Sequence, residues 1–532
     1  MKRTLRILLI LVFVLLAGCQ PAPTTDWYKD AVFYEIFVRS FYDSNGDGIG
    51  DFNGIREKLD YLNDGDPKTT TDLGITGIWL MPIMPSPSYH GYDVTDYKAV
   101  NPQYGTLDDF KRLVEECRKR GIKVIIDLVI NHTSSQHPWF TAALNGDPAY
   151  KDYYVWEQTK PSSGGPLGSN PWHEAANGEY YYGVFWGGMP DLNYKNPAVT
   201  REINNITAFW LKETGIDGFR VDAARYLFED GLVLEDSDNT IRWFQDWRAT
   251  VKKLAPKSFT VGEVWADLPV QARYADPKGL DSLFMFDLAE DFKSAAYAGQ
   301  SSGVHAGYQQ ALQVFPDGAF STFLSNHDQQ RVASMLEEKS YKLKEAAFLY
   351  LTGPGIPFIY YGEELGLTAN KPDENLRTPM PWSSEANGGF STGTPWEPLR
   401  PAWEQVNAAT LSADEASLLN WYRRLIRLRN DNPALRTGAY LPVKSNCPTV
   451  YATLRVLGKD ALLTLANLNK FNADGCTLSI DASPLRGEYK VEALWGTAQF
   501  PAVTFDDTGA FKDLLAAPSL ASTETLVVKL IK

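Results

Sequence analysis

The chain has 532 residues, of which 44% are hydrophobic and 22% are charged, a composition typical of globular proteins and unlike that of a disordered polymer. At roughly 150 residues per domain, the length allows about three domains or one large barrel with attachments, and it excludes a single small binding module. Asp and Glu (65) outnumber Lys and Arg (51), which gives a net charge of −14, and no basic run interrupts this balance. We therefore expect no nucleic acid among the partners.

The N-terminus has the pattern of an export signal. Three basic residues precede an uncharged run over 7–17, which is shorter than the roughly 20 residues of a membrane span. The run leads into Leu-Ala-Gly-Cys at 16–19, which resembles the bacterial lipobox, where the cysteine is lipidated and becomes the first mature residue. The sequence predicts a lipoprotein signal peptide at 1–18, a tether at 19–25, and an exported protein anchored to the cell envelope through lipid on Cys19. The alternative is an ordinary cleaved signal with an incidental cysteine.

The remaining cysteines show no metal or redox spacing. They are Cys117, Cys447 and Cys476. Export permits a disulfide, and Cys447 and Cys476 both fall in the C-terminal portion, so they are candidates for a pair that the sequence leaves open. Cys117 lies in a helical pattern over 108–120 and is predicted to be a buried thiol.

Eight short apolar runs alternate with helical patterns along most of the chain. Such alternation indicates parallel strands joined by crossover helices. Eight strands across about 400 residues predict an α/β fold, a (β/α)8 TIM barrel with insertions, whose catalytic groups gather at the carboxyl ends of the strands. The predicted strands are 32–41, 77–82, 123–131, 218–223, 259–264, 282–288, 321–326 and 357–361.

Two segments interrupt or follow this alternation. The stretch 133–191 is rich in Gly, Pro and aromatic residues and is too long for an ordinary loop, so it predicts a subdomain B inserted after strand 3, beside the mouth of the active site. After a helical pattern at 417–428, short alternating runs predict an all-β sandwich domain at 433–532. The catalytic barrel then comprises 26–132 and 192–432.

Acidic residues follow three of the predicted strands. Asp222 ends the run DGFRVD, Glu263 lies in GEVW, and Asp328 closes SNHD. Retaining hydrolysis of a glycosidic bond needs one carboxylate that attacks the anomeric carbon and another carboxyl group that protonates the leaving oxygen. A single acid of this kind is more often solvated or structural, but three at one end of a barrel favour this chemistry.

These motifs resemble those of glycoside hydrolase family 13, the α-amylase family, and the resemblance runs from about Asp26 into the C-terminal domain. It implies that Asp222 is the nucleophile, Glu263 the acid/base, and Asp328 the group that holds sugar hydroxyls and stabilises the transition state. The signature regions are DLVINH at 127–132, MPDLN at 189–193, GFRVD at 218–222, GEVW at 262–265 and NHD at 326–328.

Further residues are expected to bind the sugar. Arg220 precedes Asp222 by two positions on the same strand face, so its cation can keep the nucleophile ionised. The resemblance implies that His132 and His327 donate hydrogen bonds to the sugar at the cleavage point, and that Tyr92 is an aromatic platform for the same sugar.

The HGYD motif that contains Tyr92 also supplies His90 and Asp93. By resemblance to the oligo-1,6-glucosidase branch, Asp93 is expected to pair with Arg377. In α-glucosidases such a pair closes the far end of the pocket and enforces the release of single glucose units.

The loop DSNGDGIGD at 43–51 offers oxygen ligands at alternate positions, as calcium requires. It begins like an EF-hand loop, but Gly54 stands where the twelfth-position Glu would be, and the alternative is a hydrated turn. Resemblance to loops of the family implies a structural calcium ion held by Asp43, Asn45, Asp47, the carbonyl of Ile49 and Asp51.

A second calcium ion is implied between the barrel and the inserted subdomain. Its ligands would be Asn131, Asp191 and a backbone carbonyl at Tyr226, a position that carries His in many α-amylases. The substitution leaves the carbonyl available but makes this second ion the less secure of the two.

The sequence thus predicts a monomeric α-amylase-type hydrolase that cleaves α-1,4-glucosidic bonds of starch and maltodextrins with retention. An oligo-1,6-glucosidase, neopullulanase or transglycosylase would use the same triad, and a non-catalytic starch-binding lipoprotein is disfavoured by the intact triad. MPDLN lies between the QPDLN of oligo-1,6-glucosidases and the MPKLN of neopullulanases, which points to an intermediate branch. Ala223 matches neither the Val of many α-1,6-specific enzymes nor the Thr of many α-1,4-specific ones, so we expect a roomy acceptor side.

Overall fold

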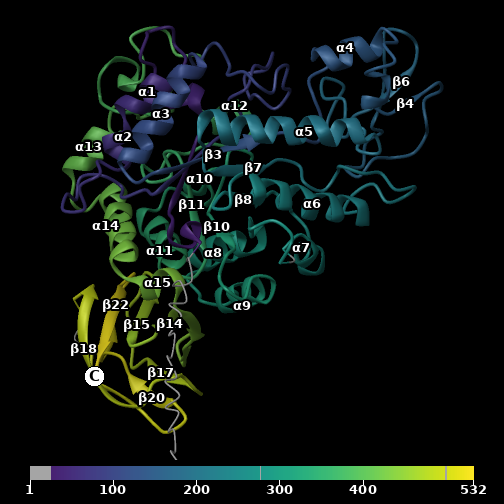
Figure 1. The fold of residues 1–532 in the computed structure, drawn as a ribbon. Helices are drawn as coiled ribbons and strands as arrows, with labels where there is room; N and C mark the ends of the chain where they lie inside the picture. The colour runs from purple at the N-terminus through teal and green to yellow at the C-terminus, as the bar shows by residue number, and fades with distance from the viewer. Residues whose placement is uncertain (1–25, 276, 498–499) are drawn as a thin grey trace, which may run out of the picture.

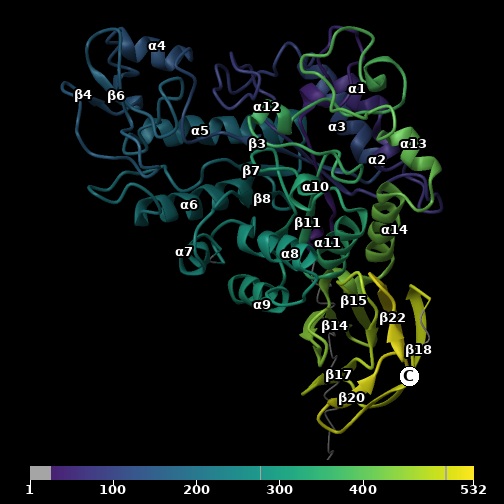
Figure 2. The same cartoon turned by 180° about the vertical axis from the view of Figure 1, so that it is seen from behind.

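The computed structural model describes residues 26–275, 277–497 and 500–532, so the predicted signal peptide and tether lie outside the described residues. Figures 1 and 2 place a barrel at the centre, with a small subdomain beyond one end of α5 and a β domain beyond α14 and α15. In the part of the chain that is described, no helix is long and apolar enough to cross a membrane.

Eight parallel strands form the barrel. Hydrogen bonds join them in the order β10-β11-β1-β2-β3-β7-β8-β9, and a bridge between Phe284 and Ser321 connects the two ends. Nearly every strand residue is buried, as expected where helices cover the outer face of a parallel sheet. The predicted TIM barrel is confirmed, with strands β1 (Phe33–Ile36), β2 (Gly77–Leu80), β3 (Lys123–Leu128), β7 (Gly218–Val221), β8 (Phe259–Gly262), β9 (Ser282–Leu283), β10 (Ser321–Thr322) and β11 (Ile356–Tyr360).

The helices around the barrel form because apolar residues recur at helical spacing. In α3, Thr106 and Asp109 form a capping box at the start, and Phe110, Leu113 and Cys117 face the core, which is the arrangement expected of an amphipathic helix. Cys117 is buried and unpaired, as predicted. The longer helices are α3 (Leu107–Lys119), α5 (Pro197–Phe209), α6 (Asp238–Leu254), α8 (Phe286–Ala298), α9 (Val304–Val314), α11 (Ser340–Thr352) and α14 (Leu418–Asp431).

Shorter helices complete the barrel and its loops. The predicted strand at 282–288 is too long at its end, because Phe286 already begins α8. The short α-helices are α1 (Phe52–Glu57), α2 (Leu59–Leu62), α4 (Pro138–Leu144), α7 (Leu268–Tyr274), α10 (Val332–Met335), α12 (Asp373–Leu376), α13 (Ala408–Ala413) and α15 (Pro433–Thr437). Single helical turns lie at Trp27–Asp30, Val38–Ser40, Lys151–Tyr153, Trp210–Thr214 and Ala386–Gly389.

The segment after β3 forms the small subdomain seen beside α5 in Figure 1. It contains α4 and a three-stranded antiparallel sheet of β4 (Trp156–Glu157), β6 (Tyr180–Tyr182) and β5 (Trp172–Glu174). Bridges from His132 to Asp191 and from Tyr154 to Leu192 attach it to the barrel. The subdomain therefore begins and ends at the carboxyl end of β3.

The C-terminal domain predicted at 433–532 begins with the short helix α15 and is all β from β12 onward. Its main antiparallel sheet has the order β12-β14-β15-β22-β18-β19. A disulfide joins Cys447 and Cys476, so the pairing that the sequence left open is formed. The strands are β12 (Ala439–Pro442), β13 (Lys444–Ser445), β14 (Val450–Leu457), β15 (Asp460–Asn467), β16 (Ala473–Asp474), β17 (Thr477–Ile480), β18 (Gly487–Trp495), β19 (Val503–Phe505), β20 (Phe511–Leu515), β21 (Ser519–Leu520) and β22 (Thr525–Ile531).

Candidate active site

A cavity of about 310 Å³ lies where the carboxyl ends of the barrel strands meet the inserted subdomain. Asp222 follows β7, Glu263 follows β8, and Asp328 follows β10, so three strand ends bring the three predicted acids to one cavity. The lining residues are His90, Tyr92, His132, Phe185, Trp186, Met189, Asp222, Ala223, Glu263, Asp328, Asp373 and Arg377.

One buried cation connects three carboxyl groups beneath the cavity. Arg220 Nη1 lies 2.7 Å from Asp222 Oδ1 and 3.0 Å from Asp127 Oδ1, and Nη2 lies 2.8 Å from Glu263 Oε2. Burial raises the pKa of Asp222 and of Asp127, and Arg220 opposes this rise. A single guanidinium is thus shared among three carboxyl groups. Because these groups lie so close together, they titrate as a unit. Arg220 lies behind the cavity rather than in its lining.

Asp127 is a site residue that the sequence reasoning missed. It is fully buried in β3 and holds both Arg220 and the hydroxyl of Tyr92, whose Oη lies 3.1 Å from Asp127 Oδ2. One feature of the sequence could have identified Asp127: it is the first residue of DLVINH and an acid inside an otherwise apolar strand. A buried carboxylate needs a partner, and here the partner is a strand away.

Tyr92 and the histidines differ in how they meet the cavity. The Tyr92 ring lies between those of His90 and His327, at centroid distances of 6.1 and 5.5 Å. His132 lines the cavity, but burial lowers its pKa to about 4, and its Nε2 lies 3.1 Å from the carbonyl of Tyr92. His327 is fully buried directly behind the lining residues Tyr92 and Asp328, with its Nε2 2.6 Å from Tyr92 Oη and 3.1 Å from Asp328 Oδ2, and its expected contact with the sugar stays a prediction.

The expected pair of Asp93 and Arg377 is not formed. Asp93 is buried and accepts hydrogen bonds from the hydroxyls of Ser86 (2.5 Å) and Ser88 (2.8 Å). Arg377 instead lies 2.8 Å from Asp328 Oδ1 and 3.6 Å from Asp373 Oδ2. The two serine hydroxyls satisfy Asp93 locally, and the guanidinium takes the carboxylates that face the cavity, so the prediction of this pair was wrong.

Aromatic rings stand at the mouth of the cavity. Trp186 and Phe185 come from the inserted subdomain and are 51% and 40% exposed. A Cβ at Gly188 would lie 2.1 Å from the Trp186 ring, so the indole can lie against the backbone only because that residue is glycine. Two residues beyond Glu263, Trp265 is 58% exposed and stacks on Phe286 with ring centroids 4.8 Å apart. Flat apolar rings of this kind suit the faces of sugars.

The predicted calcium ligands occupy two places. In the loop after β1, Asp43 and Asp51 are buried; Asp43 accepts a hydrogen bond from the amide of Gly46, and Asp51 caps α1 by accepting from the amide of Gly54. Over residues 26–275, 277–497 and 500–532, no three His, Cys, Asp or Glu side chains converge as a metal-binding group. The donor types of the loop, carboxylate, amide and carbonyl oxygen, are nevertheless those that calcium prefers.

The second place contains oxygens without partners. Asn131 Oδ1 and Asp191 Oδ2 are buried and have no hydrogen-bond partner, although such atoms are rarely left unsatisfied. Burial, reinforced by Glu229, raises the pKa of Asp191. Glu229 was not predicted, because it lies in the loop after β7 and no motif marks it. Tyr226 turns its ring toward Phe185, with centroids 5.8 Å apart.

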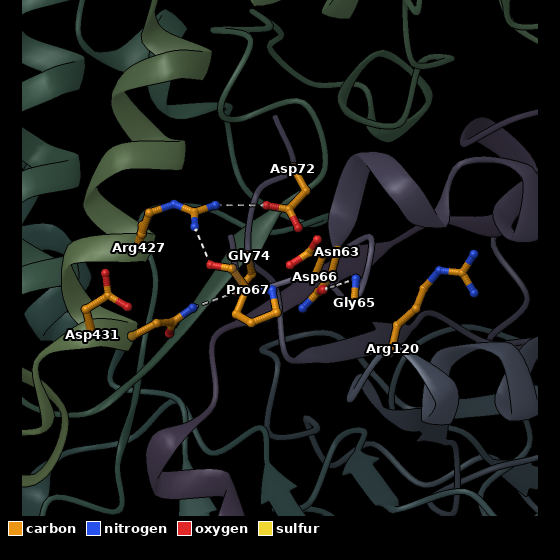
Figure 3. Close-up of a pocket in the computed structure, with 10 residues that line it drawn as sticks. Asn63, Gly65, Asp66, Pro67, Asp72, Gly74, Arg120, Arg427 and Asp431 are labelled. Atoms are coloured by element: carbon orange, nitrogen blue, oxygen red, sulfur yellow. Dashed lines mark hydrogen bonds and ion pairs between the residues drawn. The ribbon is translucent and has the colours of Figure 1, made fainter. Parts of the chain in front are cut away.

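A second hollow, of about 230 Å³, lies at the opposite end of the barrel (Figure 3). It is built from the loop before β2, from Arg120 before β3, and from the end of α14. Its buried acid, Asp72, accepts from the amide of Asp64 and lies 3.4 Å from Arg427, which also donates to the carbonyl of Pro67. Catalytic groups of such barrels lie at the carboxyl ends of the strands, so this hollow is not the active site.

A barrel that brings three acids from three strand ends to one cavity defines a glycoside hydrolase of the TIM-barrel class. Residues 35–438 match the family described as "Alpha amylase, catalytic domain", and the chain belongs to this family of glycoside hydrolases. It is 39% identical to Alpha-amylase 3 of Dictyoglomus thermophilum over 88% of this chain and 90% of that protein. It is 32% identical to the Oligo-1,6-glucosidase of Parageobacillus thermoglucosidasius, over 84% and 91%. The crystal structure of an α-amylase from H. orenii superimposes with a TM-score of 0.82 at 40% identity, covering 94% of this chain and 99% of that one.

Proposed function

We propose that this enzyme hydrolyses α-1,4-glucosidic bonds of starch and maltooligosaccharides with retention of anomeric configuration. The observation that carries the proposal is the convergence of Asp222, Glu263 and Asp328 on one cavity in a member of the α-amylase family. Relatives named as α-amylases and as an oligo-1,6-glucosidase support α-glucans as the substrate class.

In the proposed mechanism, Asp222 attacks the anomeric carbon while Glu263 gives a proton to the departing glycosidic oxygen. The bond between that carbon and that oxygen breaks, and a glycosyl ester of Asp222 forms. Glu263 then takes a proton from water, and the water oxygen displaces Asp222 from the same face. Arg220 supports this scheme, because its contact at 2.7 Å stabilises the attacking carboxylate. Asp328 holds sugar hydroxyls as positive charge develops on the ring.

The shape of the cavity supports internal cleavage of longer chains. Arg377 turns to Asp328 and leaves Asp93 to two serines, so the pair that closes the pocket of α-glucosidases is missing from this site. Ala223 has a φ of +47°, a backbone region that β-branched side chains avoid. Its small side chain supports a roomy acceptor side, with tolerance of some α-1,6 branches and transglycosylation at high substrate concentration.

Digestion of end-blocked maltoheptaoside tests this specificity. Internal cleavage, with maltooligosaccharides as the first products, is the expected result. No reaction on the blocked substrate, together with rapid release of glucose from the unblocked one or from isomaltose, would assign the enzyme to the glucosidase reaction. One mismatched contact changes selectivity by only about 1–3 kcal/mol, so the product pattern is a better test than a single rate.

Calcium is proposed as a structural ion. The unpartnered oxygens of Asn131 and Asp191 support a site between the barrel and the subdomain, with Glu229 beside it and the carbonyl of Tyr226 as a further ligand. The donor set of Asp43, Asn45, Asp47, Ile49 and Asp51 supports a site in the loop after β1. Bound calcium supplies charge that neutralises clustered carboxylates, and no step of the hydrolysis passes through it. Metal analysis of the purified protein tests both sites.

The enzyme is further proposed to be exported and anchored through lipid on Cys19. The basic residues and apolar run before Cys19 support this address. Replacing Cys19 with Ala should move the protein from the membrane fraction to the soluble fraction of the envelope. A protein that stays in the cytoplasm, or one that stays in the membrane without Cys19, would contradict the proposal. Gel filtration of the released form should give a monomer of about 60 kDa.

A further inference from the structure

His327 is enclosed between two carboxyl groups. Its Nδ1 lies 2.6 Å from Glu35 Oε1, and its Nε2 lies 3.1 Å from Asp328 Oδ2. His327 is fully buried, and Glu35 is 2% exposed. A neutral imidazole leaves one of its two nitrogens without a hydrogen. The imidazolium has an N–H toward Glu35 on one side and an N–H toward Tyr92 Oη on the other, with Asp328 Oδ2 as its ion-pair partner. The geometry thus suits the doubly protonated form.

The neighbouring tyrosine fixes the direction of the hydrogen bonds. Tyr92 Oη lies 2.6 Å from His327 Nε2 and 3.1 Å from Asp127 Oδ2. Burial raises the pKa of Asp127, but Arg220 Nη1 lies 3.0 Å from its Oδ1 and opposes this rise. As a carboxylate Asp127 accepts only, so the hydroxyl hydrogen of Tyr92 points to Asp127. Tyr92 Oη must then accept from His327 Nε2, which therefore carries a hydrogen. Burial raises the pKa of Glu35, and His327 and Arg220 oppose this rise. As a carboxylate Glu35 accepts only, so His327 Nδ1 carries the second hydrogen.

Among the described residues, His327 is the cation that contacts Glu35 directly, and Arg220 acts on it from a greater distance. The titratable and charged groups that face this assembly come from several strands and loops: Glu35 from β1, Tyr92 from the loop after β2, Asp127 from β3, Arg220 from β7, Asp328 beside His327, Tyr360 from β11, and Arg377 from the loop after β11. In the described part of the chain, His327 is the single ion-pair partner within 4 Å of Glu35. Burial alone would lower the pKa of His327, but Asp328 and Glu35 outweigh it and raise that pKa to about 10.

We propose that Glu35 is a positioning residue of this enzyme, which holds His327 as an imidazolium so that His327 and Arg377 together fix the two oxygens of Asp328 toward the bound sugar. Arg377 contacts Asp328 Oδ1 at 2.8 Å, and His327 contacts Oδ2. Glu35 itself does not line the cavity. This inference rests on the role proposed for Asp328 in the hydrolysis.

The pH dependence of kcat tests this role with Glu35→Gln, which keeps the shape and an acceptor oxygen but removes the charge. At alkaline pH His327 should lose its proton in the variant before it does so in the wild type. Because the alkaline limb of kcat also reports the general acid Glu263, the loss of the imidazolium should add a further decline of kcat at alkaline pH, by about tenfold or more relative to the wild type, with a larger change in kcat than in KM. Glu345→Gln is the matched control, because Glu345 is equally buried but lies on α11, and it should leave the profile unchanged. A Glu35→Gln profile that superimposes on that of the wild type would overturn the proposal.

Nitrogen NMR of the imidazoles gives a test that does not depend on activity or on folding of the variant. The chain has six histidines, and burial lowers the pKa of His90, His132, His137 and His305. At pH 8 the wild type should retain one doubly protonated imidazole. As the pH is raised, Glu35→Gln should lose this proton at a lower pH than the wild type does. If the wild type has no such signal, the proposal fails. If the signal is present and the enzyme cleaves no α-glucan, the proposed function fails while the pairing of Glu35 with His327 stands.

Discussion

Glu345 gives a direct link between a buried carboxyl group and the stability of the barrel. Its side chain lies in α11, is 1% exposed, and has both oxygens buried without a hydrogen-bond partner. Burial raises the pKa of this carboxyl to about 8. The folded protein therefore keeps Glu345 protonated at neutral pH, whereas the unfolded chain ionises it near its ordinary pKa of 4.5.

The sign of the effect follows from proton linkage. Between pH 4.5 and 8 the folded state binds one more proton at this site than the unfolded state, so the free energy of unfolding falls as pH rises, by about 1.4 kcal/mol per pH unit. Over the whole interval the loss amounts to roughly 5 kcal/mol. Above pH 8 both states are ionised and the difference becomes constant. Replacing Glu345 with Gln removes the titration and therefore this part of the alkaline loss.

Urea unfolding followed by tryptophan fluorescence at pH 5, 6, 7 and 8 measures the effect. The advantage of Glu345→Gln over the wild type should grow with each step. Glu415→Gln, which neutralises an exposed acid, is the control and should show no such trend. A difference between Glu345→Gln and the wild type that stays constant across this range would refute the reasoning.

Three further predictions concern the site, the calcium loop and the disulfide. Asp222→Asn and Glu263→Gln should each lower kcat by at least roughly 1000-fold with little change in melting temperature; near-normal turnover in either variant would remove that residue from the mechanism. Asp47→Ala should lose one calcium ion per chain and melt at a lower temperature. Its free energy of unfolding should be lower by about 3 kcal/mol if calcium is present at about 100 times its Kd; unchanged calcium content and melting temperature would rule out this site. Cys447→Ser should destabilise the protein by about 3–4 kcal/mol, as expected for a cross-link between residues 29 positions apart; a reductant that lowers the melting temperature of wild type and variant equally would contradict this origin.

The sequence was sufficient for the barrel and for the acids at its strand ends. Short apolar runs alternating with helical patterns carry the fold, because each parallel strand must be buried on both faces. Asp222, Glu263 and Asp328 could be placed together because the carboxyl ends of barrel strands meet at one face. The end of the sixth strand was set too late, since an apolar run cannot distinguish a buried strand from the first turn of α8.

The partners of charged groups were harder to predict. Glu35 and His327 are 292 positions apart, and nothing local indicates that they touch. From the sequence, either Asp93 or Asp328 could pair with Arg377. Arg377 pairs with Asp328 because the hydroxyls of Ser86 and Ser88 already donate hydrogen bonds to Asp93.

A lone acid in an apolar strand is nevertheless a usable signal. Glu35 and Asp127 both have this property, and both turn out to hold other site residues. Burial of a carboxylate without a partner is costly, so each such acid implies an unseen partner. The identity of that partner depends on strand order and side-chain reach, which the sequence does not specify.

The stereochemistry of the first product tests the central claim most directly. Two carboxyls that act as nucleophile and acid/base produce two inversions and therefore net retention. Proton NMR of a maltooligosaccharide digest, recorded within the first minutes, before the new reducing ends equilibrate, should detect the α-anomer first. Initial appearance of the β-anomer would contradict the covalent role of Asp222 and the account of the site that depends on it.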